Sequence, residues 1–186
     1  MQPSSWQLTC KHLHRLTDTM VAGRITEELA IAVPAEQMWK AAFASGDESS
    51  MRNVLTGVSD VAVKVEGDGG PGSRYTLKFN PAVGAGTVLI KSRLAARDNA
   101  ARVISYDEVV VEGGEVAAPQ FKSQVVQYKV EPAGAGGCVT KIAVESERLD
   151  GTPLSLADDQ AKLMKVYVDL IKKVEENIVA RPREFA

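Results

Sequence analysis

The stretch Glu66-Gly-Asp-Gly-Gly-Pro-Gly-Ser-Arg-Tyr-Thr-Leu-Lys-Phe79 joins a glycine-rich run to a segment of alternating apolar and polar residues. Between Gly67 and Gly72 the glycines follow the spacing G-x-G-x-x-G, which is typical of dinucleotide-binding proteins. That function requires a strand before the glycines and a helix after them, because the pyrophosphate binds at the helix N-terminus. The residues on either side of the glycines therefore decide whether a nucleotide site is predicted.

Both flanking segments are predicted to be strands. Tyr75, Leu77 and Phe79 alternate with polar residues, and a period of two indicates a strand with one buried face. Residues 61–65, before the glycines, are rich in β-branched side chains and also read as extended. The glycines thus join two strands and supply the positive φ angles of a tight connection. Neither a dinucleotide site nor a Walker loop, which would end in Gly-Lys-Ser/Thr, is predicted.

Further strand-like segments follow at regular intervals along the chain. Turns rich in glycine, proline or asparagine separate them, and this spacing is typical of an antiparallel meander. An earlier strand ends at Pro34, where a short helix is predicted to begin, and a second short helix is predicted from Ser50 to Leu55. Besides 61–65, the predicted strands cover residues 27–33, 75–79, 87–94, 101–112, 120–132 and 138–149.

The C-terminal segment has the period of a helix. Ser155 is a suitable N-cap, Arg181-Pro182 a suitable end, and the apolar positions between them form one stripe. A curved sheet and one amphipathic helix bury their apolar faces best against each other. The sequence therefore predicts an α+β fold, with the long helix across the concave face of the sheet and the short helices at one end. The stripe is Leu163, Val166, Tyr167, Leu170, Val174 and Ile178.

Length and composition fit one domain without a metal or cofactor. The chain of 186 residues is long enough to bury a core, and its net charge of -2 gives no reason to expect a nucleic acid or an acidic membrane. Two cysteines, Cys10 and Cys138, make no disulfide framework, which fits a reducing compartment. No apolar run approaches the ~20 residues that span a bilayer. We expect a cytoplasmic monomer, present also in the nucleus.

Four pieces of the chain, in order, resemble the Bet v 1 family of plant class-ten pathogenesis-related and major latex proteins. The loop at 66–72 is the most specific piece, residues 27–39 are similar to the family's first strand and helix, and Glu112-Gly-Gly114 matches a turn. The last residues, 177–186, are similar to the end of its C-terminal helix. The resemblance implies the START-like helix-grip fold, in which a curved seven-stranded antiparallel sheet, two short helices and a long C-terminal helix enclose a cavity.

Residues 1–19 differ from the rest of the chain, since they are basic and rich in hydroxyl side chains with Asp18 as the one acid. That composition resembles a transit peptide. Because the family resemblance covers residues 20–186, we interpret 1–19 as an extension from an upstream start codon and expect it to be disordered. His12 and His14 are too close together on such a segment to be good metal ligands.

The wall of the cavity is predicted from strand parity and from the helix stripe. Polar residues among the inward positions argue against a solid core, since an unpaired buried polar group costs roughly 1–3 kcal/mol. The resemblance implies small hydrophobic ligands such as flavonoids, cytokinins, brassinosteroids or other phytohormones. The glycine-rich loop, Gly67, Asp68, Gly69, Gly70, Pro71 and Gly72, is a second candidate site. The candidate wall is Leu77, Phe79, Leu89, Tyr106, Glu108, Val110, Ser123, Val125, Gln127, Ile142, Val144, Ser146, Leu163, Val166, Tyr167 and Leu170.

A ribonuclease is the first alternative, because some family members are described as such. Their proposed catalysts are a Lys, two Glu and a Tyr, and these positions fall on Thr76, near Phe121, on Glu175 and on Asn177. Glu175 alone is retained as a catalytic candidate. Acid–base cleavage of a phosphodiester needs at least two positioned proton carriers, so weak activity at most is predicted.

A receptor of the abscisic-acid type, which inhibits a protein phosphatase, is the second alternative. Its gate, Ser-Gly-Leu-Pro-Ala, and its latch, His-Arg-Leu, are both missing, at 81–86 and 112–119. A phosphatase partner therefore rests on analogy of fold alone.

A third alternative is catalysis of condensation or isomerisation, as in a few relatives. Tyr106 and Glu108 would form the candidate pair, because a Glu in an apolar cavity has a raised pKa and exchanges protons readily. A cation beside Glu108, such as Lys91 or Arg93, would instead give it a structural role. The function we predict is that of an intracellular, defence-related plant protein that binds a small hydrophobic metabolite between helix and sheet.

Overall fold

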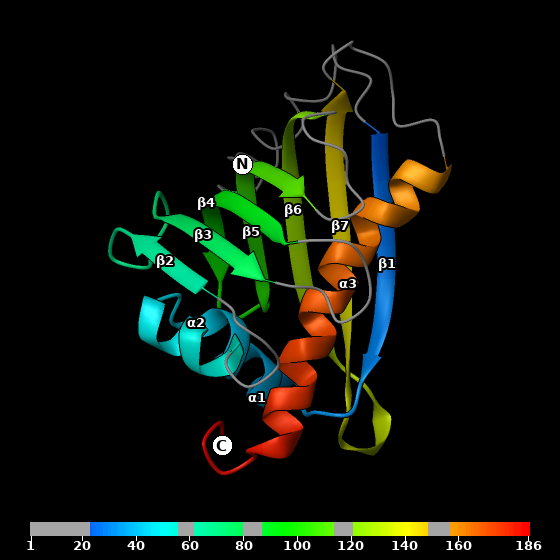
Figure 1. Ribbon diagram of the computed structural model, residues 1–186. Coiled ribbons are helices and arrows are strands. Elements are labelled where there is room, and N and C mark those ends of the chain that lie inside the picture. The colour runs from blue at the N-terminus through cyan, green and yellow to red at the C-terminus, as the bar shows by residue number, and fades with distance from the viewer. Residues whose placement is uncertain (1–22, 56–61, 80–86, 114–120, 149–156) are drawn as a thin grey trace, which may run out of the picture.

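The computed structural model describes residues 23–55, 62–79, 87–113, 121–148 and 157–186 and confirms the predicted α+β fold (Figure 1). One antiparallel sheet has the strand order β1-β7-β6-β5-β4-β3-β2. Strands β2 to β7 form the expected meander, and β1 is the edge strand beside β7. The strands are β1 Gly23–Ile31, β2 Ala62–Glu66, β3 Arg74–Phe79, β4 Val88–Asp98, β5 Val103–Gly113, β6 Phe121–Pro132 and β7 Cys138–Arg148.

Helices cover one face and one end of this sheet. The short helix α1 (Ala35–Trp39) continues into a π-helical turn, η2 (Lys40–Ala44), and α2 spans Glu48–Leu55. The long helix α3 (Ala157–Ala180) lies across the concave face, while α1 and α2 lie together at the end near the C-terminus (Figure 1). Among the described helices, none combines the length and the apolarity that a membrane crossing requires.

The glycine-rich loop joins β2 to β3, which pair antiparallel, so the prediction of a strand on each side is confirmed. Its backbone amides are used within the protein. Gly69 N–H donates to Ser73 Oγ over 3.0 Å, Gly70 N–H to Asp68 Oδ1 over 2.8 Å, and Gly72 N–H to the Leu94 carbonyl over 2.7 Å. These three amides are therefore not available to a phosphate.

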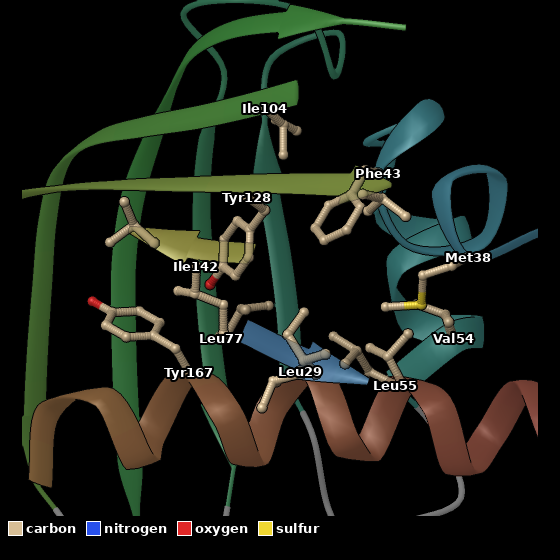
Figure 2. Close-up of a cluster of buried hydrophobic side chains, with 14 of the residues drawn as sticks. Leu29, Met38, Phe43, Val54, Leu55, Leu77, Ile104, Tyr128, Ile142 and Tyr167 are labelled. Carbon is tan, nitrogen blue, oxygen red and sulfur yellow. The ribbon is translucent and has the colours of Figure 1, made fainter. Parts of the chain in front are cut away.

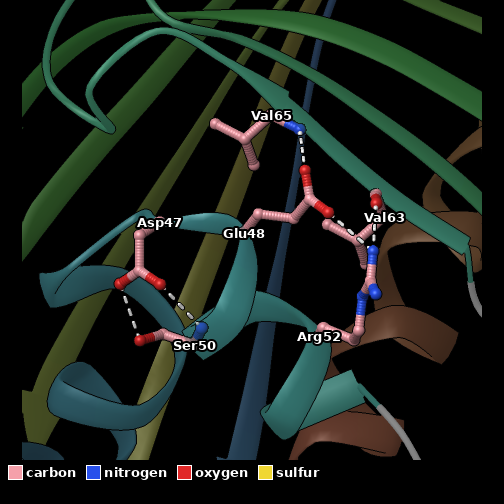
Figure 3. A network of polar contacts seen from close by, with 6 residues as sticks. All are labelled: Asp47, Glu48, Ser50, Arg52, Val63 and Val65. Carbon is pink, nitrogen blue, oxygen red and sulfur yellow. Dashed lines mark hydrogen bonds and ion pairs between the residues drawn. The ribbon is translucent and has the colours of Figure 1, made fainter.

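Two side chains of helix α2 form hydrogen bonds with backbone groups at the free edge of β2 (Figure 3). Glu48 Oε2 accepts a hydrogen bond of 3.1 Å from Val65 N–H, and Arg52 Nη2 donates one of 3.3 Å to the Val63 carbonyl. The same Arg52 nitrogen lies 2.6 Å from Glu48 Oε1. An edge strand with unpaired backbone groups is a template for aggregation, and these two side chains cover part of that edge.

We expect Glu48→Ala to lower the free energy of unfolding by about 1 kcal/mol, because Val65 N–H and Arg52 both lose an acceptor. Urea denaturation measures the change. Ser49→Ala, at an exposed position of the same helix, is the control and should leave the unfolding free energy unchanged. Equal effects of the two substitutions would contradict the role given to Glu48.

The start of α2 lies two residues earlier than predicted, because Asp47 caps it. The Asp47 carboxylate accepts bonds from the Ser50 amide (2.9 Å) and the Ser50 hydroxyl (2.7 Å) (Figure 3). The Ser50 backbone amide is the main cause that lowers the pKa of Asp47 below its usual 3.8. This is the geometry of a helix N-cap.

The capping carboxylate predicts an acid-sensitive contribution to stability. Since the folded pKa of Asp47 is depressed, its contribution is complete above the unfolded pKa, about 3.9, and is lost as the pH falls through the folded value. Asp47→Asn should keep the cap but remove this pH dependence. We expect the loss of unfolding free energy between about pH 6 and pH 3 to be smaller in the variant. An identical loss in both proteins would show that Asp47 does not contribute to it.

The long helix packs as its stripe predicts, and Figure 2 shows one member of the stripe, Tyr167, among the buried side chains. Leu163, Val166, Tyr167, Val174 and Ile178 are buried, and Leu170 is half-buried. Near the C-terminal end, Asn177 Nδ2 donates a buried hydrogen bond of 2.8 Å to the Val54 carbonyl of α2. The helix ends at Ala180, before Arg181-Pro182, as predicted. The predicted cap, Ser155, lies outside the described residues.

A β-bulge interrupts β5. The pairing of β5 with β6 shifts between Tyr106 and Val109, and Glu108 between them has a φ of 50°. A bulge inserts an extra residue and reverses the alternation beyond it. Ile104 and Tyr106 face inward before the bulge, and Val109 and Val111 are buried after it. This reversal decides which β5 residues face the helix.

Candidate ligand-binding cavity

A cavity of about 70 Å³ lies between α3, the two segments η2 and α2, and the concave face of β3 to β6. Its wall is mostly aliphatic and aromatic. The polar residues among those that line it are Ser92 and four tyrosines. Figure 2 shows several of its residues between the long helix and the sheet. The wall consists of Ala42, Phe43, Met51, Val54, Leu55, Tyr75, Leu77, Ile90, Ser92, Tyr106, Val109, Val126, Tyr128, Tyr167, Leu170, Ile171 and Val174.

A contiguous row of aromatic rings runs along this wall. Trp39, behind the wall, lies 5.4 Å from Phe43, and Phe43 stacks on Tyr128 with 5.3 Å between ring centroids. Tyr128 contacts Tyr106 edge-on at 6.3 Å, and Tyr106 contacts Tyr75 edge-on at 5.7 Å. Aromatic ring pairs are stabilised by such offset and edge-to-face contacts. The row thus combines a stacked pair with edge-on pairs along one side of the cavity.

All four tyrosines of the sequence line the cavity, and two of them have hydroxyls that bond to none of the described residues. Tyr167 O–H donates to Gln124 Oε1 over 2.7 Å, and Tyr75 O–H donates to the Gly69 carbonyl over 3.3 Å. Within the described parts of the chain, no group bonds to the hydroxyls of Tyr106 and Tyr128. Burial raises the pKa of each of these tyrosines above its usual 10. All four hydroxyls are therefore protonated at neutral pH and can donate.

Residues 20–181 match the model of the pathogenesis-related protein Bet v 1 family. The chain belongs to this family. It is 29% identical over 167 residues to pathogenesis-related protein 1 of Asparagus officinalis, a match that covers 89% of this chain and 99% of the relative. The predicted family membership is thus confirmed.

Several solved structures share the fold of this Bet v 1 family protein. Ara h 8.0201 superposes with a TM-score of 0.63 at 20% identity, over 86% of this chain and 99% of the other. Norcoclaurine synthase from Thalictrum flavum, in complex with dopamine and hydroxybenzaldehyde, gives a TM-score of 0.61 at 20% identity over 87% and 88%. Major latex-like protein 151 from Panax ginseng gives 0.58 at 14% identity over 86% and 97%. At these identities the likeness establishes the fold.

Several predicted wall residues lie where expected. Leu77, Tyr106, Tyr167 and Leu170 line the cavity. Four others are buried but belong to the solid core beside it: Ile142, Val144, Leu163 and Val166. That any of these side chains contacts a ligand stays a prediction.

The inward orientation predicted for Leu89, Val125 and Gln127 is wrong. In β6 the inward residues are Gln124, Val126 and Tyr128, while Val125 is 42% exposed and Gln127 is exposed. Two adjacent valines, at 125 and 126, allow either parity, and a shift of one residue exchanges the faces of a strand. In β4, likewise, Ile90 and Ser92 line the cavity instead of Leu89.

The inward orientation predicted for Glu108 and Val110 is also wrong, because of the bulge in β5. Glu108 is exposed and pairs with Arg74 at 3.0 Å and with Arg93 at 3.5 Å. Its neighbour Val109 lines the cavity instead. The candidate pair of Tyr106 with Glu108 therefore does not form, since the two side chains lie on opposite faces of the sheet. The alternative considered from the sequence was a structural role for Glu108 beside a cation such as Arg93. The observed contact agrees with that alternative.

Glu175, the other catalytic candidate, lies outside the cavity wall and has structural partners. Its carboxylate accepts a hydrogen bond of 2.6 Å from Ala32 N–H and lies 2.9 Å from Lys172 Nζ. Lys172 also donates to the Ala30 carbonyl. These contacts attach the C-terminal half of α3 to the end of β1 and the residue after it. Among the residues that the structure describes, the wall contains no carboxylate, and its titratable groups are the tyrosines.

Sequence reasoning missed more than half of the wall. The contributions of the two short helical segments, Phe43 and Met51 among them, carry no periodicity that distinguishes a cavity from a core. Tyr75 has the same parity as Leu77 and was detectable by that rule. The clearest signal is the placement of tyrosine, because all four occur at wall positions and the prediction included only Tyr106 and Tyr167.

Some predictions fall outside the described parts of the chain. They concern residues 1–19 with His12 and His14, the segment 81–86, and most of 112–119. The side chains of Phe79 and Ser123 belong to the same group, although their backbones lie in β3 and β6.

Proposed function

We propose that this Bet v 1 family protein binds small, flat, largely apolar molecules in the cavity between α3 and the sheet. The observation that carries the proposal is the aromatic row on a mostly apolar wall, with two tyrosine hydroxyls that bond to no described residue. A flat ring packs on Tyr128 and Phe43, and an acceptor atom on the ligand receives a hydrogen bond from Tyr106 or Tyr128. Binding sites of this kind combine apolar walls with few polar groups that fix orientation.

The chemistry of the wall favours aromatic ligands over bulky saturated ones. The aromatic row matches the flat rings of cytokinin-like and flavonoid-like molecules better than the saturated rings of brassinosteroids. A ligand that hides ~250 Å² of apolar surface gains about 6 kcal/mol at ~25 cal/mol per Å², from which ordering costs are subtracted. We expect dissociation constants in the micromolar range and limited selectivity. The proposal includes a role in plant defence inside the cell, and family membership supports that role.

The alternatives receive less support from the geometry. Glu108 and Glu175 have ion-pair partners and lie away from the cavity, so we propose neither a ribonuclease nor a condensing enzyme. An abscisic-acid-type role with a phosphatase partner rests on the fold alone. The norcoclaurine synthase structure shows that a protein of this fold holds small aromatic molecules. This precedent supports the type of ligand proposed.

The experiment is a fluorescence titration of the full chain with anilinonaphthalene sulfonate, followed by displacement with a flavonoid and with a cytokinin. We expect saturable binding at micromolar concentration and competitive displacement by both. Absence of any saturable binding by all three compounds would overturn the proposed function.

A further inference from the structure

We propose that Gln124 and Ser146 form a polar subsite that binds one oxygen atom of the ligand, a carbonyl oxygen by preference. The proposal rests on the proposed function, because it concerns the same ligand. It adds a chemical requirement that the apolar wall does not impose. The subsite lies on β6 and β7, one step beyond the cavity wall along the sheet.

The two side chains are buried neighbours on the inner face of the sheet. Gln124 and Ser146 are direct partners in the β6–β7 register and are exposed by 1% and 2%. Gln124 continues the inward row of β6, in which the next two members, Val126 and Tyr128, line the cavity. Directly opposed residues on an antiparallel pair have Cβ atoms about 4.5–5.5 Å apart. The two polar groups therefore share one small region.

Both groups lack a hydrogen-bond partner among the residues that the structure describes. Neither Gln124 Nε2 nor Ser146 Oγ bonds to any of them, although each atom is fully buried. An unsatisfied buried polar group costs roughly 1–3 kcal/mol, and folded proteins rarely leave two of them side by side. A partner atom from outside the chain removes this cost for both.

The hydroxyl of Tyr167 orients the glutamine amide. It donates to Gln124 Oε1 over 2.7 Å, and this bond leaves the N–H groups of Nε2 directed elsewhere. Ser146 O–H is a second donor. Two neighbouring donors match a carbonyl oxygen, which accepts two hydrogen bonds. Tyr167 itself lines the cavity, so it connects the apolar wall to the subsite.

A matched pair of small probes tests this requirement. Acetophenone and α-methylstyrene have the same planar shape, and the second carries a methylene group in place of the carbonyl oxygen. Displacement of anilinonaphthalene sulfonate from the full chain gives the affinity of each. For the wild-type protein we expect acetophenone to bind about tenfold tighter, the worth of one or two buried hydrogen bonds.

Gln124→Met should abolish this preference, so that the two probes bind with about equal affinity. The shape of the side chain is kept and the hydrogen-bond donor is lost. The matched control is Gln127→Met, on the same strand but on the exposed face, which should keep the tenfold preference. Ser146→Ala is a second variant that tests the subsite if Gln124→Met does not fold, and it should reduce the preference to about threefold.

The outcomes separate the two proposals. If both probes bind the wild-type protein equally, the subsite is wrong and the proposed function stands, since the two polar groups then bind no more than an ordered water. If neither probe displaces anilinonaphthalene sulfonate, the subsite is wrong, whereas the proposed function fails only if the dye, the flavonoid and the cytokinin all fail to bind. A preference that Gln124→Met and Ser146→Ala leave unchanged would also overturn the subsite.

Discussion

Leu170→Trp should weaken the binding of anilinonaphthalene sulfonate by about tenfold or more, which corresponds to at least about 1.4 kcal/mol. Leu170 is a half-buried wall residue of α3, so an indole at this position has room to turn inward without distorting the solid core. A cavity of about 70 Å³ has little space left once a larger ring enters it. The affinity comes from the same fluorescence titration.

The control for this prediction is Val179→Trp. Val179 lies on the same helix, and its side chain is 56% exposed on the surface. It should bind the probe with wild-type affinity and unfold at the wild-type urea midpoint. Unchanged binding by a folded Leu170→Trp protein would mean that the probe binds elsewhere.

Gly113→Ala should lower the free energy of unfolding by roughly 3 kcal/mol or more, the largest effect of any single substitution considered for stability. Gly113 has a φ of +86°, and a Cβ on it would lie 2.1 Å from the Thr87 carbonyl oxygen. That oxygen belongs to the backbone at the start of β4, which cannot move without breaking the pairing with β5. Urea denaturation followed by circular dichroism measures the change.

Gly136→Ala separates the two causes of this loss. Gly136 has a similar φ of +80°, but a Cβ there would have no neighbour within 4 Å. The substitution should cost about 1 kcal/mol, the penalty of the left-handed conformation alone. If the two variants lose equal stability, the close contact with Thr87 contributes nothing and the explanation for Gly113 is wrong.

The sequence was sufficient for the fold because its patterns extend over whole elements. The alternation in Tyr75, Leu77 and Phe79 showed that the glycine-rich loop joins two strands, which excluded a nucleotide site. The stripe from Leu163 to Ile178 extends over several turns, so a single exception such as the half-buried Leu170 did not obscure it. Patterns of this length survive small errors in register.

The cavity wall was harder to predict, because it depends on single residues. The bulge at Glu108 reverses the faces of β5, and a positive φ at a glutamate has no sequence signal. In β6 the adjacent Val125 and Val126 fit either face equally well. The choice between them depends on pairing with β5 and β7, which local patterns do not contain. Wall residues from η2 and α2 follow only from tertiary packing.

The two catalytic candidates illustrate a different limit. Glu108 and Glu175 were chosen by position, and the contacts that give them structural roles come from residues far away in the sequence. Ala32, the partner of Glu175, lies 143 positions earlier. Parity placed Gln127 inside, whereas Gln124, the residue of the proposed subsite, is the buried glutamine of β6.

The most direct test of the binding cavity is an NMR measurement of intermolecular NOEs between bound acetophenone and the uniformly labelled protein. We predict NOEs from the phenyl protons of the ligand to the ring protons of Tyr106 and Tyr128 and to the methyl groups of Val126. NOEs confined to exposed side chains such as Val125 and Val179, with none to the tyrosine rings, would contradict the account.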